Sequence, residues 1–294
     1  MTPGNHALSI KASYTKTSYI RPRSLDEAVA LLSAGDARIL SGGTDFYPAL
    51  GDRVIRDAVV DVSGLRELRG VSHEPERFRI GGLTTWSEIL RTPLPCCFDA
   101  LRSAAREVGS VQIQNRGTVA GNLCNASPAA DGVPPLLALD AEVELVSKTG
   151  VRKMPLADFI VGSRKTQLKP DELLAAVLVP RELENATSTF LKLGARRYLV
   201  ISIAMAAVIL QVHDKRVVAA RVAVGSCSAV ARRLRALEDE LLGVSVRAGL
   251  SSVVRPEHLA PLAPIDDVRA TAEYRMDASL RLVQRALSSS VEKS

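Results

Sequence analysis

The chain has 294 residues, with 38 lysines and arginines against 32 aspartates and glutamates, which gives a net charge of +6. At about 100–200 residues per domain, this length predicts two domains, and it is sufficient for a buried core without disulfides or a structural metal. Apolar residues make up 47% of the chain and aromatic residues only 4%, which argues against a disordered, fibrous or nucleic-acid-binding protein.

The cysteines and the hydropathy pattern point to a cytoplasmic protein. Cys96, Cys97, Cys124 and Cys227 include no C-x-x-C pair, so neither a disulfide framework nor an iron–sulfur cluster is expected on this chain, and a reducing compartment is favoured. The four histidines are far apart, and no metal site is predicted. No apolar run is long enough for a transmembrane segment, and the N-terminus lacks the pattern of a secretory signal.

The first third of the chain alternates predicted helices and strands. Residues 1–17 are expected to be a flexible lead. Ser24-Leu-Asp-Glu27 has the form of a capping box, which predicts a helix that begins near Ser24 and stops at Gly35. A second capping box, at Thr85, predicts another helix start, and a helical period covers 100–108. Strands are expected at 37–40, 58–62 and 78–81.

The segment 109–131 is rich in small and amide residues but has neither a helical nor a strand period. We expect it to be a packed loop that presents backbone amides to a ligand. A short helix at 136–139 and strands at 142–146 and 171–179 are predicted to follow it. The polar stretch after Pro180 predicts a domain boundary near residue 185.

The remainder of the chain has its own core pattern. Residues 201–212 and 217–224 predict a β-hairpin, and 229–242 and 268–287 predict two amphipathic helices. These elements make a small α+β domain over 186–288. Residues 289–294 are expected to form a frayed tail.

Two glycine-containing loops are candidates for holding a diphosphate. The first is Ser41-Gly-Gly-Thr-Asp45 and the second is Arg116-Gly-Thr-Val-Ala-Gly-Asn122. Glycine lets the backbone approach a phosphate, and backbone N–H groups can donate to its oxygens. Each loop alone is equally consistent with a plain tight turn. Together they predict a dinucleotide between two subdomains, without the G-x-G-x-x-G fingerprint of a Rossmann fold.

The sequence resembles the flavin-binding medium subunit of the molybdenum hydroxylases, the family of carbon monoxide dehydrogenase and xanthine dehydrogenase. The resemblance is carried by blocks that start at Arg21, Ser41, Gln112 and Asp267. It implies an α+β protein with an FAD-binding fold of the vanillyl-alcohol-oxidase type over 18–185, made of two subdomains divided near residue 70. It also implies that residues 186–288 form a C-terminal domain of the carbon monoxide dehydrogenase flavoprotein type.

The resemblance also implies a set of FAD-binding residues, and it implies neither a catalytic residue nor a metal ligand on this chain. The two loops would grip the diphosphate, three residues after them would contact the phosphate and the adenosine ribose, and a lysine would lie near the flavin. For the lysine, a solvated surface position is the alternative. In the order of these roles, the residues are Ser41, Gly42, Gly43, Thr44 and Asp45; Thr118, Val119, Ala120, Gly121 and Asn122; Asn125, Ser127 and Asp131; and Lys165.

Ala120 departs from the family pattern, which often has glycine at this position. We expect Ala120 to adopt an extended, strand-like conformation, with its methyl group narrowing access to the flavin. If position 120 required a positive φ, an alanine there would also strain the backbone.

The resemblance implies an electron-transfer role. A large molybdopterin-binding partner would oxidise the substrate, and [2Fe–2S] clusters on a small partner would pass electrons to FAD on this chain. From there the electrons would go to NAD⁺, a quinone or oxygen. One alternative is a stand-alone flavin-dependent oxidase or dehydrogenase on the same fold, and another is a non-catalytic assembly subunit that has lost FAD.

Overall fold

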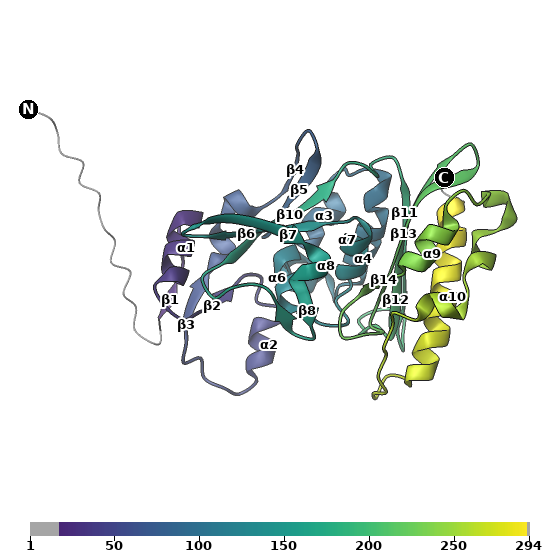
Figure 1. The fold of residues 1–294 in the computed structure, drawn as a ribbon. Coiled ribbons are helices and arrows are strands. Elements are labelled where there is room, and N and C mark those ends of the chain that lie inside the picture. The colour runs from purple at the N-terminus through teal and green to yellow at the C-terminus, as the bar shows by residue number, and fades with distance from the viewer. Residues whose placement is uncertain (1–17, 293–294) are drawn as a thin grey trace, which may run out of the picture.

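The computed structural model describes residues 18–292, so the predicted flexible lead over 1–17 lies outside the described residues. The mixture of helices and strands confirms the α+β class (Figure 1). We call residues 18–186 the N-terminal lobe and residues 187–292 the C-terminal lobe, because they build separate sheets. The predicted boundary near 185 falls between these sheets.

A small parallel sheet with strand order β1-β3-β2 opens the N-terminal lobe. The predicted helix at Ser24 is confirmed, since the Ser24 hydroxyl accepts from the Glu27 N–H at 3.2 Å. The Glu27 carboxylate, however, accepts from the N–H of Arg23 at 2.7 Å. The elements are β1 (Tyr19–Ile20), α1 (Leu25–Ser33), β2 (Ala37–Leu40), α2 (Phe46–Leu50) and β3 (Ala58–Asp61).

A five-stranded antiparallel sheet follows, with strand order β4-β5-β10-β6-β7. The central strand, β10, is buried on both faces. Leu173 and Ala175 pack into one core cluster, and Leu174 and Val177 pack into another. The predicted division near residue 70 falls between the two sheets of this lobe. The strands are β4 (Val71–His73), β5 (Arg77–Gly81), β6 (Glu142–Ser147), β7 (Gly150–Pro155) and β10 (Leu173–Pro180).

Short helices connect these strands. Both halves of the capping box at Thr85 are present. The expectation of an irregular loop over 109–131 is wrong, because Ser110 and Thr118 each cap a helix that is too short to show a period. The helices are α3 (Trp86–Arg91), α4 (Asp99–Glu107), α5 (Val111–Arg116), α6 (Val119–Asn125), α7 (Val133–Ala138) and α8 (Leu156–Phe159), and a small hairpin is formed by β8 (Ile160–Gly162) and β9 (Lys165–Thr166).

The C-terminal lobe is a four-stranded antiparallel sheet with two helices. Its predicted hairpin is confirmed. The predicted helix over 229–242 begins only at Arg235, because Arg232 and Arg233 pair with the sheet edge. The elements are β11 (Thr187–Leu193), β12 (Ala204–His213), β13 (Arg216–Gly225), β14 (Arg232–Arg233), α9 (Arg235–Leu241) and α10 (Ala272–Val291).

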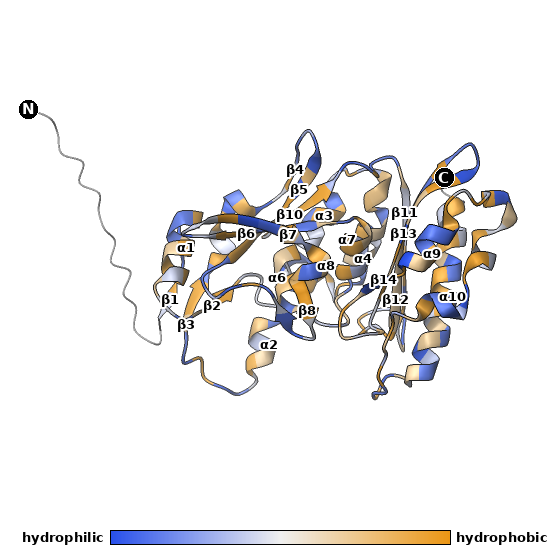
Figure 2. Cartoon of the chain, in the orientation of Figure 1, coloured by the Kyte–Doolittle hydropathy of each residue, from blue (hydrophilic) through white to orange (hydrophobic). Residues whose placement is uncertain are grey.

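Strand β12 joins the two lobes, because its residues from Ala204 to Leu210 are all apolar and buried. Figure 2 colours hydrophobic residues of the chain orange. Side chains alternate across a strand. Met205, Ala207 and Ile209 therefore pack in one core cluster with α4 and α7 of the N-terminal lobe. Ala206 and Val208 pack in the other with α9 and α10. This sheet is the middle layer between helices of both lobes.

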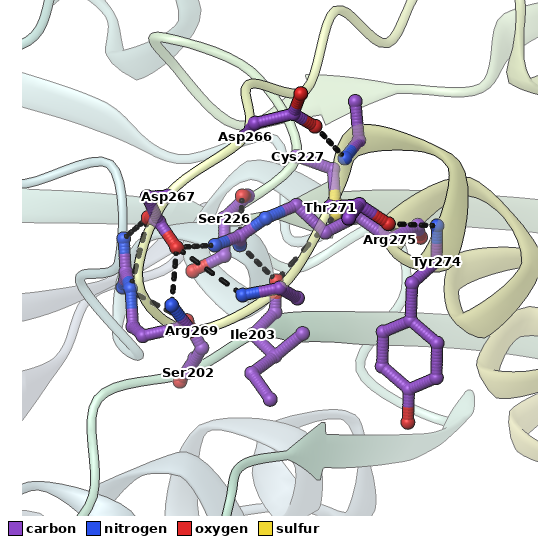
Figure 3. Close-up of polar contacts among 12 residues, drawn as sticks. Ser202, Ile203, Ser226, Cys227, Asp266, Asp267, Arg269, Thr271, Tyr274 and Arg275 are labelled. Atoms are coloured by element: carbon purple, nitrogen blue, oxygen red, sulfur yellow. Dashed lines mark hydrogen bonds and ion pairs between the residues drawn. The ribbon is translucent and has the colours of Figure 1, made fainter.

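A buried arginine near the start of α10 ties that helix to the sheet. The Arg275 guanidinium is 1% exposed and donates to the carbonyls of Ile203 at 2.6 Å and Ser226 at 3.2 Å (Figure 3). It also pairs with the Asp267 carboxylate at 2.7 Å. The sequence block from Asp267 to Arg275 therefore stabilises the fold of the C-terminal lobe.

Asp267 also determines where α10 begins. Its carboxylate accepts from the backbone N–H of Arg269 at 2.8 Å and pairs with the Arg269 guanidinium, which lowers the pKa of Asp267. This turn displaces the helix start from the predicted residue 268 to Ala272. The Arg269 guanidinium also donates to the Ser202 carbonyl at 3.2 Å, which holds the turn against the segment that precedes β12.

The end of α10 differs from the predicted frayed tail. The helix continues through Val291, because Ser290 is buried and its carbonyl accepts from the Thr187 hydroxyl at 3.1 Å. Residues 293–294 lie outside the described residues.

An ionic cluster at Asp140 fastens the C-terminal lobe to the end of α7. Its carboxylate accepts from Arg221 at 2.7 Å and from Arg233 at 2.6 Å, and the Arg233 guanidinium also pairs with Glu238 at 2.5 Å. Burial raises the pKa of Asp140, but the hydrogen bond from Arg221 and the charge of Arg233 outweigh it and lower the net pKa. Arg233 and Glu238 are 7% and 5% exposed. If one of these side chains is removed, water therefore cannot solvate the charge of the other.

We expect Arg233→Met to lower the free energy of unfolding by about 3–5 kcal/mol, because it leaves the buried Glu238 without its closest cation. Arg232→Met is the matched control: Arg232 lies beside it in β14 but is exposed, and we expect a change below about 0.5 kcal/mol. Urea denaturation of the two variants measures the difference. Equal stability of both variants would contradict a fastening role for this cluster.

Candidate functional site

The two glycine loops meet in the structure. The hydroxyls of Ser41 and Thr118 lie 2.9 Å apart and share a hydrogen bond. A Cβ atom on Gly42 would lie 1.9 Å from the carbonyl oxygen of Arg116, a distance that no side chain can occupy. Glycine at position 42 is therefore required for the first loop to approach the second.

The second loop is held from behind by residues 82–86. The N–H of Val119 donates to the Thr84 carbonyl and that of Ala120 to the Gly82 carbonyl, both at 2.9 Å. The Gly121 N–H donates to the Thr118 hydroxyl at 3.0 Å. The N–H groups of Val119, Ala120 and Gly121 therefore already have protein partners and are not free donors.

The predicted extended conformation of Ala120 is wrong. Ala120 lies in α6, because the Thr118 cap begins the helix one residue before it. Its φ is not positive, so Ala120 does not carry the backbone strain that a positive φ would cause. The Ala120 side chain does line the pocket described below.

The first loop retains free donors. Among the described residues, the N–H groups of Gly42, Gly43 and Thr44 have no hydrogen-bond partner. Gly43 has a φ of +79°, a conformation that glycine adopts without strain. Successive free N–H groups in such a turn form a concave site for an anion.

A pocket of about 540 Å³ opens between the two loops and continues toward β10. All five predicted residues of the first loop line it, and so do four predicted residues from the second loop and the residues after it. The predicted residues that the structure brings together here are Ser41, Gly42, Gly43, Thr44, Asp45, Ala120, Gly121, Asn122 and Asn125.

Five predicted residues lie outside this lining. Thr118 lines a smaller cavity of about 110 Å³ on the other side of Gly42. Val119 is fully buried, and the Ser127 hydroxyl accepts from the Ala129 N–H at 3.3 Å. Lys165 is exposed on β9. Their predicted contacts with the cofactor remain predictions.

Asp131 also lies outside the pocket lining. One of its carboxylate oxygens pairs with the Lys192 ammonium and the other accepts from the Ser202 hydroxyl, both at 2.7 Å. Both partners belong to the C-terminal lobe. Asp131 therefore links the two lobes, and its predicted contact with a ribose remains a prediction.

Asn122 is the most informative polar residue of the pocket. Its side-chain oxygen is buried and has no hydrogen-bond partner among the described residues. A buried polar atom without a partner costs about 1–3 kcal/mol, so this oxygen is suited to a donor from a bound molecule.

Several lining residues were missed by the sequence analysis. Arg38, with its guanidinium 4.7 Å above the Phe46 ring, forms one wall. The apolar wall comes from distant segments, including Ile113, Leu168 and Leu174. Arg38 and Phe46 flank the first loop in the sequence and could have been found from that position; the apolar residues carry no local signal.

Cys124 lines the same pocket, and burial raises the pKa of its thiol to about 12. The thiol is therefore protonated at neutral pH and is a poor nucleophile.

The chain matches two family models in succession. Residues 13–182 match the FAD binding domain in molybdopterin dehydrogenase, and residues 189–290 match the CO dehydrogenase flavoprotein C-terminal domain. Caffeine dehydrogenase subunit beta of Pseudomonas sp. (strain CBB1) is 32% identical over 95% of this chain and 96% of its own length. The nicotinate dehydrogenase FAD-subunit of Eubacterium barkeri is 37% identical over 67% of this chain and 69% of its own.

Solved structures share the whole fold. Carbon monoxide dehydrogenase from Hydrogenophaga pseudoflava superposes with a TM-score of 0.82, at 27% identity, over 92% of this chain and 96% of that one. Quinoline 2-oxidoreductase from Pseudomonas putida 86 gives a TM-score of 0.84 at 25% identity, over 96% and 99% of the two chains.

Within residues 18–292, no helix combines the length and apolar character needed to cross a bilayer.

The paired loops, the pocket between them and the two family matches lead to one assignment. The chain belongs to the FAD-binding subunits of the molybdenum hydroxylase-type dehydrogenases and is an oxidoreductase subunit.

Proposed function

We propose that the chain binds FAD between its two glycine loops and relays electrons from [2Fe–2S] clusters of a partner chain to an external acceptor. The observation that carries this proposal is the set of free N–H groups at Gly42, Gly43 and Thr44 beside the pocket. When bound, FAD supplies the redox chemistry, which none of the side chains that line the pocket can supply.

The residues present fit such a cofactor. The free amides of the first loop would donate to the diphosphate. The buried oxygen of Asn122 would accept from a hydroxyl of the dinucleotide, which would end its unpartnered state. The apolar wall, with Leu168 and Leu174, would exclude water from a flat ring. The Arg38 guanidinium would add positive charge near the phosphates.

Relatives with names such as "medium chain" and "subunit beta" support assembly with a large molybdopterin-binding subunit and a small [2Fe–2S] subunit. Two of the similar structures are a Cu,Mo carbon monoxide dehydrogenase and a carbon monoxide dehydrogenase that lacks the Mo-pyranopterin moiety of its molybdenum cofactor. As part of this proposal we assign the clusters to a partner chain; among the described residues no group of three metal-ligating side chains is found. All four cysteines are free, which supports a reducing cytoplasm.

The proposal is tested by purifying the tagged chain from a flavin-replete source and from the native complex. We expect a yellow chain that takes up one FAD, and co-purification of a molybdenum-containing chain and an iron–sulfur chain. A colourless chain that also fails to bind added FAD would exclude the proposal. Turnover of an organic substrate by the isolated chain would instead favour a stand-alone oxidase.

We expect Gly42→Ala to weaken FAD binding at least about tenfold, because overpacking by its methyl group against the Arg116 carbonyl costs about 1–3 kcal/mol and separates the loops. Gly162→Ala is the control, since its Cβ would meet only Lys165 atoms at 3.7 Å. Calorimetric titration of both variants with FAD provides the measurement. Unchanged affinity in Gly42→Ala would show that the two loops need not meet.

Asn122→Ala is expected to lower FAD affinity about fivefold, the effect of one lost hydrogen bond, while the melting temperature of the FAD-free chain stays within a few degrees. The reason is that the Asn122 oxygen has no protein partner to lose. The exposed Asn185 provides the control, Asn185→Ala. A large loss of stability without FAD would mean that Asn122 has a structural role instead.

A further inference from the structure

A second cleft, of about 590 Å³, lies at the junction of the two lobes and carries positive charge. Its walls come from α4, from β11 with the loop that follows it, and from α10. Arg196 and Arg197 project from the loop, and Arg285 projects from α10. The complete lining is Ser103, Glu107, Phe190, Leu191, Lys192, Leu193, Gly194, Arg196, Arg197 and Arg285.

The charge of this cleft is not balanced by the protein. Among the described residues, no carboxylate lies within 4.0 Å of the guanidinium groups of Arg196, Arg197 or Arg285. Lys192 is neutralised by its pair with Asp131, and Glu107 is the one acidic side chain in the described lining. The cleft is therefore lined by three arginines that have no carboxylate partner in the described part of the chain and by a single glutamate.

The loop that carries two of the arginines is built to hold its shape. Leu199 adopts a φ of +53°, and its carbonyl accepts from Nε and Nη2 of Arg196 at 3.2 and 2.5 Å. A Cβ atom on Gly194 would lie 2.4 Å from a methyl group of Val200, so the loop folds back closely on itself. The Arg197 guanidinium donates to the Tyr198 hydroxyl at 3.0 Å.

The cleft adjoins the cofactor pocket. Glu107 lines the cleft and Val108, the next residue, lines the pocket. The carbonyl of Glu107 also accepts from the Lys192 ammonium at 3.4 Å. A molecule in the cleft would thus lie beside the end of α4 that also borders the cofactor.

We propose that this cleft binds the diphosphate of a nucleotide that serves as the electron acceptor. Arginine is suited to this task because its planar guanidinium donates two parallel hydrogen bonds to phosphate oxygens. The inference rests on the proposed electron-transfer function and deepens it. Of the acceptors considered above, it selects the dinucleotide over the quinone and oxygen, since neither of these carries an anionic group for three arginines.

The test uses the full chain saturated with FAD, so that the cofactor pocket is filled. Calorimetric titration with NAD⁺, and with inorganic diphosphate as the minimal probe, measures binding at low and high salt. We expect both probes to bind, the affinity of both to fall as salt rises, and Arg285→Gln to weaken both about tenfold. Arg281→Gln removes the same charge one turn earlier on α10, outside the cleft lining, and is expected to leave binding unchanged.

The outcomes separate this inference from the proposed function. A chain that binds FAD but neither probe overturns the acceptor site and leaves the electron-transfer proposal standing. Equal effects of Arg285→Gln and Arg281→Gln also overturn it, because binding would then follow net charge alone. If neither probe binds but Arg285→Gln weakens recovery of the partner chains, the cleft is a protein interface instead. Failure to bind FAD at all would exclude the proposed function itself.

Discussion

The site depends on the contact between the Gly42 backbone and the Arg116 carbonyl, where no Cβ atom fits. This approach brings β2, which ends just before the first loop, against α5 and α6 from another part of the chain. The second loop is fixed in turn by backbone hydrogen bonds to residues 82–86, so the first loop closes on a preformed surface. Val119 and Ala120 of the second loop use their N–H groups for this support, whereas the N–H groups of Gly42, Gly43 and Thr44 in the first loop have no partner among the described residues.

The sequence predicted the parts of the site that lie within single motifs. The glycine loops, the helix cap at Ser24, the capping box at Thr85 and the hairpin of the C-terminal lobe each carry a local signal, and the structure has all of them. Helices α5 and α6 were missed because six or seven residues are too few to show a helical period. The apolar pocket wall and the partners of Asp131 come from segments far apart in the sequence, which no local pattern brings together.

Strand β12 accounts for the relation between the two lobes. Its two apolar faces are covered by helices of different lobes, so separating the lobes would expose one face of a central strand to water. The ionic clusters at Asp140 and Asp131 add charged contacts at the same junction. The Asp267–Arg269 turn holds Ser202, whose hydroxyl binds Asp131. The cofactor pocket and the basic cleft therefore have a fixed separation.

The protonated state of Cys124 has a consequence for how the chain keeps its cofactor. Covalent attachment of a flavin requires a nucleophile, and the one thiol among the described lining residues has a pKa of about 12. A flavin bound in this pocket would therefore not be attached through Cys124. Replacing FAD with a synthetic flavin of altered reduction potential would accordingly require no bond to Cys124 to be broken.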